Sequence, residues 1–408
     1  MKLSEFFIKT QKDFPRDEQS VSAQFLIRGG YIDKVAAGVY TLLPLGVRTV
    51  SKIMANVSAA MQEVGGQEIY MSGLVPKSNW EQTGRWDSFD ILFRLKGADE
   101  REYALGATHE EIVTPLAKKF IKSYKDLPIY FYQIQNKFRN EVRAKSGVLR
   151  TREFLMKDLY SFHKDKQDLD EYYEKVKQKY LELFTQMGIG EKTYFTFASG
   201  GDFTKYSHEF QTEAEAGEDE VYVCKSCKTG LNREILGEGY KCPECGNEEY
   251  DLKKTIEVGN IFKLGTKFSK PFDLTYKDEK DQDRPVEMGC YGIGIQRLMG
   301  TIAEVNHDDK GLIWPQRIAP FEIYLISLGD NQEKSEKIYQ ELSKMFDVLW
   351  DDRDDVSAGE KFADADLLGM PWRVIVSDKT GDKIELKARG AGEAALVSLD
   401  EATKKILG

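Results

Sequence analysis

The sequence has few cysteines and few prolines, and it contains no long apolar run. Only 5 of its 408 residues are cysteine and 11 are proline. The longest uncharged stretch near the N-terminus, Val35–Val47, is shorter than the roughly 20 apolar residues that a membrane-spanning helix needs. Met1 is followed by charged and polar residues instead of the apolar core of a secretory signal. These absences predict a cytoplasmic protein that has no contact with a membrane.

The chain also lacks an excess of basic charge. Its 58 lysines and arginines are outnumbered by 68 aspartates and glutamates, which gives a net charge of −10. A protein that coats nucleic acid through bulk electrostatics needs the opposite sign, so nucleic acid would have to bind at a local site. The content of 41% hydrophobic and 12% aromatic residues is that of a globular protein, and the length favours two or three domains.

The residue pattern divides the chain into three regions. In residues 1–319, helical and strand-like segments alternate, and a helix is predicted over 168–187 because apolar residues recur there every three or four positions. Within this region, Cys, Gly, Glu and Lys dominate the segment 220–254, which is too short to form a core of its own. Strands and helices alternate again over 320–408, which predicts an α/β domain.

The strongest local signal is the basic segment 137–157. It contains seven basic residues and two acidic ones, a local charge of +5, and strand-like runs at 129–134 and 154–160 flank or overlap it. Arginine side chains match phosphate oxygens in a bidentate geometry, so this pattern favours a polyphosphate site. A solvated charged hairpin would have the same composition.

The order of residues in this segment resembles the second signature motif of class II aminoacyl-tRNA synthetases. Phe138–Glu141 (FRNE) is followed by Arg150, Phe154 and Asp158 at four-residue spacing. Alternation along a strand would place these last three side chains on one face, and it would do the same for Arg139 and Glu141.

Two further segments are similar to the remaining class II motifs. Glu287–Arg297 has the glycine spacing of a strand that runs into a helix, like the third motif. Residues 37–46 and the helix expected after them resemble the first motif, which in this class forms a dimer interface. We therefore expect a homodimer that forms around Leu43–Ser51.

Additional segments are similar to the bacterial type of the prolyl-tRNA synthetase family: Ala107–Glu111, Ser207–Phe210, Glu257–Phe262, Gly289–Gly292 and residues 351–371. This resemblance implies an α+β class II catalytic domain over 1–319, with an antiparallel sheet flanked by helices, and an α/β anticodon-binding domain over 320–408. The implied reaction uses ATP and Mg²⁺ to convert proline into prolyl-adenylate and pyrophosphate. The prolyl group is then transferred to the 3′ end of tRNA(Pro).

The resemblance also implies roles for individual residues. Arg139 and Arg297 are the expected catalytic residues, which act by positioning and electrostatics because the attacking carboxylate is already ionised. The expected ATP-binding residues are Arg139, Glu141, Arg150, Thr151, Phe154, Glu257, Asn260 and Arg297. The expected proline-binding residues are Thr108, Glu110, Arg139, His208 and Phe262. Asn260 stands where bacterial relatives usually carry histidine.

The segment 220–254 contains two cysteine pairs, Cys224-x-x-Cys227 and Cys242-x-x-Cys245. Four thiolates in this spacing are typical of a structural Zn²⁺ site, and they predict a small zinc-ribbon-like insertion. Reduced free thiols are the alternative. Typical bacterial members of the family insert a large domain at this place that hydrolyses mischarged Ala-tRNA, and this segment is far too short for it.

Two other functions compete with proline activation. A synthetase-like protein without catalytic activity tends to lose the phosphate-binding arginines, but Arg139, Arg150 and Arg297 are all present. A threonine enzyme would place a zinc on Cys and His ligands in the catalytic site, but the paired cysteines here lie in the insertion. Residues 320–408 carry 12 basic and 19 acidic residues, so RNA recognition there must depend on a few side chains, and Arg353, Lys361 and Arg373 are candidates.

Overall fold

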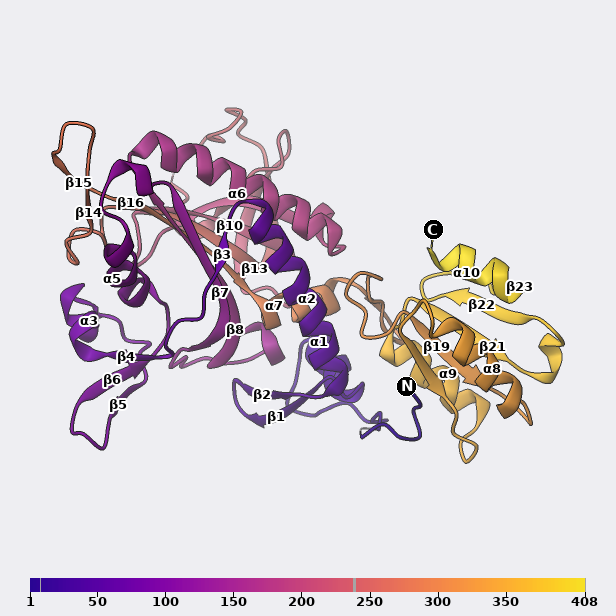
Figure 1. The fold of residues 1–408 in the computed structure, drawn as a ribbon. Coiled ribbons are helices and arrows are strands. Elements are labelled where there is room, and N and C mark those ends of the chain that lie inside the picture. Colours follow the sequence, from indigo (N-terminus) through magenta and orange to yellow (C-terminus); the bar gives the residue numbers. More distant parts are fainter. Residues whose placement is uncertain (8, 238–239, 408) are drawn as a thin grey trace. The chain divides into compact units, whose positions relative to one another are not determined.

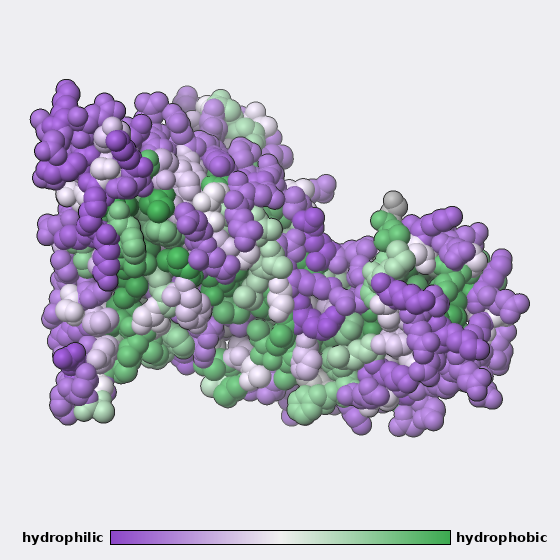
Figure 2. Space-filling view, in the orientation of Figure 1, coloured by the Kyte–Doolittle hydropathy of each residue, from purple (hydrophilic) through white to green (hydrophobic). Residues whose placement is uncertain are grey.

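The computed structural model describes residues 1–7, 9–237 and 240–407, which form two compact units (Figure 1). The larger unit comprises residues 36–39 and 54–301, and the other comprises residues 1–35, 40–53 and 302–408. Among the described residues, every helix is too short or too polar to span a bilayer. On the face shown in Figure 2, hydrophilic side chains cover much of the surface, and apolar side chains also reach it in places.

The larger unit is built on a nine-stranded sheet with the order β10-β9-β12-β11-β13-β16-β8-β7-β3. Most neighbours are antiparallel, whereas β3 pairs with β7, and β12 with β9, in parallel. The strands are β3 (Gln67–Glu68), β7 (Ile129–Phe138), β8 (Glu153–His163), β9 (Thr193–Ser199), β10 (Tyr206–Glu213), β11 (Asp219–Cys224), β12 (Gly230–Asn232), β13 (Tyr250–Gly265) and β16 (Glu287–Gly294). The expected antiparallel sheet is therefore present, with two parallel pairings.

Helix α6 (Lys166–Gln186) packs against β8, β13 and β16. Its apolar residues recur every three or four positions and are buried, and the Asp165 carboxylate caps the first turn by accepting the N–H of Asp168. Gly188 follows with a positive φ of 77°, which suits glycine at the end of a helix. The helix predicted over 168–187 is confirmed.

Strands β7 and β8 form the hairpin that carries the basic segment. The pairing runs from Ile129 opposite Phe162 to Phe138 opposite Glu153. The expectation that Arg139 and Glu141 share a strand face is wrong, because β7 ends at Phe138. Beyond it the backbone forms loop hydrogen bonds instead, from Arg139 N–H to the Arg152 carbonyl and from Glu141 N–H to the Arg139 carbonyl.

Smaller elements complete the larger unit and its edges. A three-stranded sheet has the order β4-β6-β5, and β14 pairs with β15. The elements are β4 (Leu74–Pro76), α3 (Lys77–Gln82), α4 (Arg85–Ser88), β5 (Arg94–Lys96), β6 (Glu102–Leu105), α5 (Glu110–Phe120), β14 (Thr275–Lys277), β15 (Asp283–Pro285) and α7 (Ile295–Val305).

The other unit contains a five-stranded sheet with the order β20-β19-β21-β22-β23. The first three strands are parallel, and β22 and β23 are antiparallel. Its elements from residue 323 on are β19 (Ile323–Ser327), α8 (Gln332–Leu342), β20 (Val348–Asp351), α9 (Ala358–Leu368), β21 (Trp372–Val376), β22 (Ile384–Ala388), β23 (Ala395–Val397) and α10 (Leu399–Leu407). The predicted alternation of strands and helices is confirmed.

N-terminal elements also belong to this unit. They are α1 (Val21–Arg28), most of the hairpin β1 (Ile32–Ala36) and β2 (Val39–Leu42), and the start of α2 (Pro44–Glu63). Lys2 forms a parallel bridge with Trp350, and the Leu3 N–H donates to the Trp350 carbonyl. Tyr31 donates to the Leu368 carbonyl and accepts from the Trp314 indole. Residues more than 300 positions apart are thus joined in one core.

The three basic residues considered for RNA recognition are engaged within this unit. Arg353 donates to the carboxylates of Asp351 and Asp364, and Lys361, only 3% exposed, donates to the Ser327 carbonyl. The Arg373 guanidinium lies 4.9 Å from the centre of the Phe362 ring. Their first role is therefore to hold the fold together.

Candidate active site

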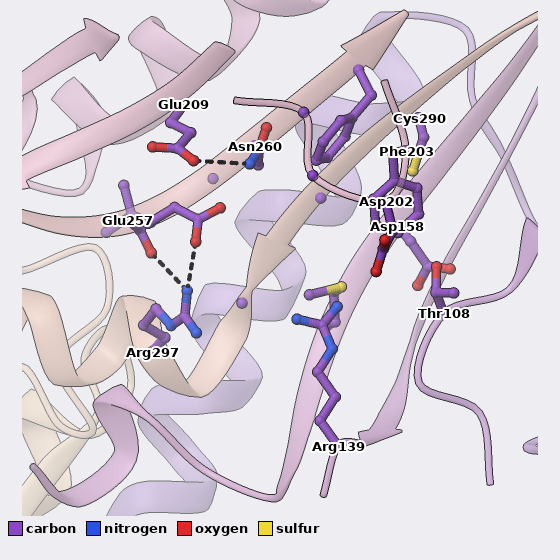
Figure 3. Close-up of a pocket in the computed structure, with 18 of the residues that line it drawn as sticks. Thr108, Arg139, Asp158, Asp202, Phe203, Glu209, Glu257, Asn260, Cys290 and Arg297 are labelled. Carbon is purple, nitrogen blue, oxygen red and sulfur yellow. Dashed lines mark hydrogen bonds and ion pairs between the residues drawn. The ribbon is translucent and has the colours of Figure 1, made fainter. Parts of the chain in front are cut away.

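A cavity of about 280 Å³ lies on the large sheet, lined by residues of β8, β10, β13 and β16 and of the loop 199–203 (Figure 3). In this view Thr108, Asp158 and Cys290 lie to the right, and Glu257 and Arg297 to the left. Seven of the residues expected at the site line this cavity: Thr108, Arg139, Phe154, Glu257, Asn260, Phe262 and Arg297.

A second cavity of about 240 Å³ adjoins the first, because Arg139, Glu257 and Arg297 line both. Two more expected residues, Glu141 and Arg150, line this second cavity. Glu218 and Asp219 line it as well, although no sequence motif points to them. Thr151 is buried and lines neither cavity.

The three arginines differ in how their charge is balanced. Arg150 Nε donates to Glu141 at 3.0 Å and its Nη1 to Glu218 at 2.7 Å. Arg297 Nη1 donates to Glu257 Oε2 at 3.1 Å. Arg139 donates to the Ala107 carbonyl, and no described carboxylate lies within ion-pair distance of it. Arg139 therefore presents a cation, without a bound counter-anion, where the two cavities meet.

The electrostatic surroundings of Arg139 favour an anion. Burial and the nearby charge of Arg297 lower the pKa of Arg139 from its ordinary value. Its guanidinium also lies 5.3 Å from the centre of the Phe154 ring. A negatively charged ligand would relieve both the burial penalty and the repulsion between the two cations.

Behind Thr108 lies a fully buried carboxylate, Glu110 at the start of α5. The Thr108 hydroxyl donates a hydrogen bond to Glu110 Oε2, and Arg85 Nη1 lies 3.8 Å from the same oxygen. Among the described residues, Glu110 Oε1 has no hydrogen-bond partner. His109, between them in sequence, turns away and lies 3.1 Å from the Ser72 carbonyl through Nε2.

Asp158 is the last residue of the motif that begins with Arg150 and Phe154, and the family resemblance implies no binding role for it. It lines the cavity and forms a buried ion pair with Lys137 at 2.7 Å, and Gln133 donates to its second oxygen. Burial opposes ionisation, but the charges of Lys137 and His109 keep the pKa of Asp158 below its ordinary value. A negative charge is therefore retained at this end of the cavity.

His208 and Glu209 are neighbours on β10 with opposite orientations. His208 stacks on Phe195 with ring centres 4.7 Å apart, and its Nδ1 lies 2.7 Å from the Tyr173 hydroxyl. Burial lowers the pKa of His208 to about 4, so the ring is neutral. Because successive side chains of a strand point to opposite faces, it is Glu209 that lines the cavity, and His208 does not.

Three side-chain amides surround the Glu209 carboxylate. Gln211 donates at 2.8 Å and Asn232 at 3.3 Å to Oε2, and Asn260 donates at 3.3 Å to Oε1. Burial, followed by the charge of Glu257, raises the pKa of Glu209 to about 8. No local sequence signal distinguishes Glu209 from His208, since only the register of β10 decides which of them faces the cavity.

The four paired cysteines come together at the end of β11. Their sulfur atoms all lie within 4.8 Å of one another, with Cys224 Sγ 3.6 Å from Cys245 Sγ and Cys227 Sγ 3.5 Å from Cys242 Sγ. Four sulfurs at such separations can serve as the ligands of one metal ion. The fifth cysteine, Cys290, is separate from them and lines the cavity.

Comparison with known proteins agrees with this architecture. Residues 93–306 match the family model "tRNA synthetase class II core domain (G, H, P, S and T)", and residues 322–408 match "Anticodon binding domain". The fold and the site therefore define a class II aminoacyl-tRNA synthetase.

Comparison with individual relatives identifies the family within this class. The proline–tRNA ligase of Ehrlichia chaffeensis is 36% identical over 426 residues and covers 100% of both chains. That of a Wolbachia from Drosophila simulans is 38% identical over 421 residues, or 98% of both chains. The protein belongs to the proline–tRNA ligase family, as its sequence motifs indicate.

Relatives differ in length. The proline–tRNA ligase of Halothermothrix orenii is 31% identical over 565 aligned residues, which cover 100% of this chain and 99% of the relative. Since this chain has 408 residues, that relative contains long stretches that this chain lacks. The Ehrlichia protein has no such stretches, because its alignment with this chain spans only 426 residues.

Proposed function

We propose that the protein is an aminoacyl-tRNA ligase that joins proline to tRNA(Pro) in two steps. In the first, a carboxylate oxygen of proline attacks the α-phosphorus of ATP, the bond to pyrophosphate breaks, and prolyl-adenylate forms. In the second, a 3′-terminal hydroxyl of the tRNA attacks the prolyl carbonyl, and AMP leaves. The observation that carries the proposal is the unpaired Arg139 cation where the two cavities meet.

Arg139 contacts the α-phosphate and the proline carboxylate in this proposal, and it stabilises the charge that develops between them. Arg297 and Arg150 bind the β- and γ-phosphates. The phosphates then replace the carboxylates with which the two arginines are now paired. Phe154 stacks on the adenine, with Arg297 over its other face. Glu141, Thr151, Glu257 and Asn260 complete the nucleotide site.

The second cavity also suits Mg²⁺. Glu257 and Asp219 line it, and carboxylate oxygens are the protein ligands that Mg²⁺ prefers. When bound, the ion supplies neutralising charge at the phosphate oxygens. The side chains then have to orient the triphosphate and hold it in line for attack.

The proline site lies at the other end of the first cavity. Thr108 and the unpartnered oxygen of Glu110 are suited to the ammonium group of proline, and Phe262 provides an apolar wall for the ring. His208 acts indirectly on this apolar wall. It contacts the Tyr173 hydroxyl, which donates to the carbonyl of Ile261, the neighbour of Phe262.

The remaining assignments follow from the proposed reaction. Residues 1–319 form the catalytic domain with 220–254 as a zinc-ribbon-like insertion, and residues 320–408 bind the anticodon. The family matches at 93–306 and 322–408 support this division. A role in protein biosynthesis places the enzyme in the cytoplasm.

Replacing Arg139 tests the mechanism. We expect Arg139→Ala to lower the rate of proline-dependent pyrophosphate exchange into ATP by about 10²- to 10⁴-fold, the scale of losing a fixed donor to a developing charge. The matched control is Arg143→Ala, because Arg143 is an exposed arginine of the same loop. A folded Arg139→Ala protein that exchanges at the wild-type rate, or a wild-type protein that prefers another of the twenty amino acids, would contradict the proposal.

The cysteine cluster is proposed to bind one structural Zn²⁺. Four thiolate ligands leave no open position for catalysis, and a segment without a core of its own gains its stability from the metal. We expect one zinc per chain by elemental analysis, loss of that zinc in Cys224→Ser, and retention in Cys290→Ser. Unchanged proteolysis of residues 220–254 after chelation, together with no zinc in the purified protein, would refute the site.

The enzyme is proposed to be a homodimer that associates around Leu43–Ser51. Val47 in this segment of α2 is apolar and 47% exposed, so a second chain could contact it. Sedimentation should show a species of twice 46.6 kDa, and Val47→Asp should shift it toward the monomer. Val142→Asp, at a 90% exposed valine outside this segment, should leave the dimer intact.

The small size of the insertion leads to a prediction about the attachment of alanine to tRNA(Pro). Alanine is smaller than proline, and each missing methylene is worth only about 1–3 kcal/mol of discrimination. We expect detectable exchange with alanine and no hydrolysis of Ala-tRNA(Pro), because a closed four-cysteine site provides no activated water. Deacylation well above the spontaneous rate on adding the purified enzyme would show that the insertion, or another part of the chain, corrects errors.

A further inference from the structure

A short strand of the insertion closes a ring of strands beside the first cavity. β10 pairs with both β9 and β13, β13 pairs with β11, and β11 pairs with β12. β12 in turn pairs with β9, so the five strands form a closed circuit. Without β12, both β9 and β11 would have a free edge at this point.

The sequence of β12 permits an unusually close approach to β9. Gly230 lies opposite Thr196, and a Cβ atom on Gly230 would lie 2.3 Å from the Thr196 hydroxyl oxygen. Thr196 is itself opposite Glu209 in the β9–β10 ladder. The insertion is therefore packed directly against the strand pair that carries the cavity wall.

Two side chains of the insertion bond groups of that wall. Asn232 Nδ2 donates to Glu209 Oε2 at 3.3 Å, and Asn232 Oδ1 accepts the Glu234 N–H at 3.3 Å. Glu234 Oε1 accepts the backbone N–H of Ser199 at 2.7 Å. Ser199 ends β9 and begins the segment 199–203, whose residues line the cavity at the Thr108 end.

Both the oxygen and the nitrogen of the Asn232 side-chain amide are therefore hydrogen-bonded. Its oxygen caps the short turn Arg233–Ile235 and its nitrogen holds Glu209, so its orientation is fixed by both partners. Glu234, within the capped turn, then holds the start of the loop. Cys227 lies in the turn between β11 and β12, and the N–H of Cys224 at the end of β11 donates to the Thr229 carbonyl. The cysteine cluster is thus joined to the wall by a few residues of paired backbone.

We propose that Asn232 and Glu234 are positioning residues for the amino acid site: they hold the Glu209 carboxylate and the loop 199–203 in the geometry that binds proline. The inference rests on the proposed activation of proline, and it does not require a metal at the cysteines. It gives the insertion a role in substrate affinity, although neither side chain lines the cavity. Losing either contact loosens one wall and leaves the phosphate-binding arginines in place.

The test is steady-state pyrophosphate exchange with separate KM and kcat values for proline and ATP. Asn232→Asp is isosteric and keeps the cap on the Glu234 N–H, but it removes the amide donor to Glu209. We expect the KM for proline to rise roughly tenfold, the effect of one lost hydrogen bond. The kcat should change less than threefold. The KM for ATP should rise less than the KM for proline, although Glu209 also bonds Asn260 of the nucleotide site. The melting temperature should stay close to that of the wild type.

Matched variants separate positioning from general loosening. Glu234→Ala should raise the KM for proline. Glu234→Gln retains an oxygen that can accept the Ser199 N–H, so its KM for proline should equal that of the wild type. Arg233→Ala is the control, because its side chain is 68% exposed and pairs with Glu220. The inference is overturned if Asn232→Asp and Glu234→Ala keep a wild-type KM for proline, or if Arg233→Ala raises it equally. A wild-type protein without proline-dependent exchange would instead overturn the proposed function.

Discussion

Backbone hydrogen bonds between β8 and its neighbours β7 and β16 align the groups of the site. The β7–β8 ladder ends at Phe138 opposite Glu153, and this fixes where the loop with Arg139 leaves the sheet. The β8–β16 ladder places Asp158 opposite Gly292 and extends to Gly294, directly before the helix that carries Arg297. Since these bonds fix the backbone that carries the charged groups before any ligand arrives, only side chains such as Arg150 and Arg297 have to change partners when a ligand binds.

The larger unit also contains charges that are costly to bury. Lys137 and Asp158 are paired below the cavity, and Arg85 donates to Glu111 at 3.0 Å. Lys157 is completely buried on the opposite face, where it bonds the Tyr180 hydroxyl and the Tyr291 carbonyl. Burial lowers the pKa of Lys157 to about 7. Pairs of this kind add little net stability, but removing one partner would leave an isolated buried charge, so they restrict the arrangements that the site can adopt.

The cysteine-rich segment 220–254 shows how residues without a core of their own can become part of a site. Its cysteines form a compact cluster, and its strand β12 fills the gap between β9 and β11. Polar contacts from this strand reach the wall of the cavity.

The sequence by itself determined the features that depend on neighbouring residues along the chain. These include helix α6, the cysteine spacing, the strand and helix order of residues 320–408, and the arginine and glycine motifs that indicated the family. Only the tertiary structure decided that Glu209 and not His208 faces the cavity, that Arg139 is unpaired whereas Arg150 and Arg297 are not, and that Asn232 reaches the wall. Such features depend on strand register and on contacts between distant segments. A shift of one residue reverses the face of every side chain in a strand, and no local pattern records it.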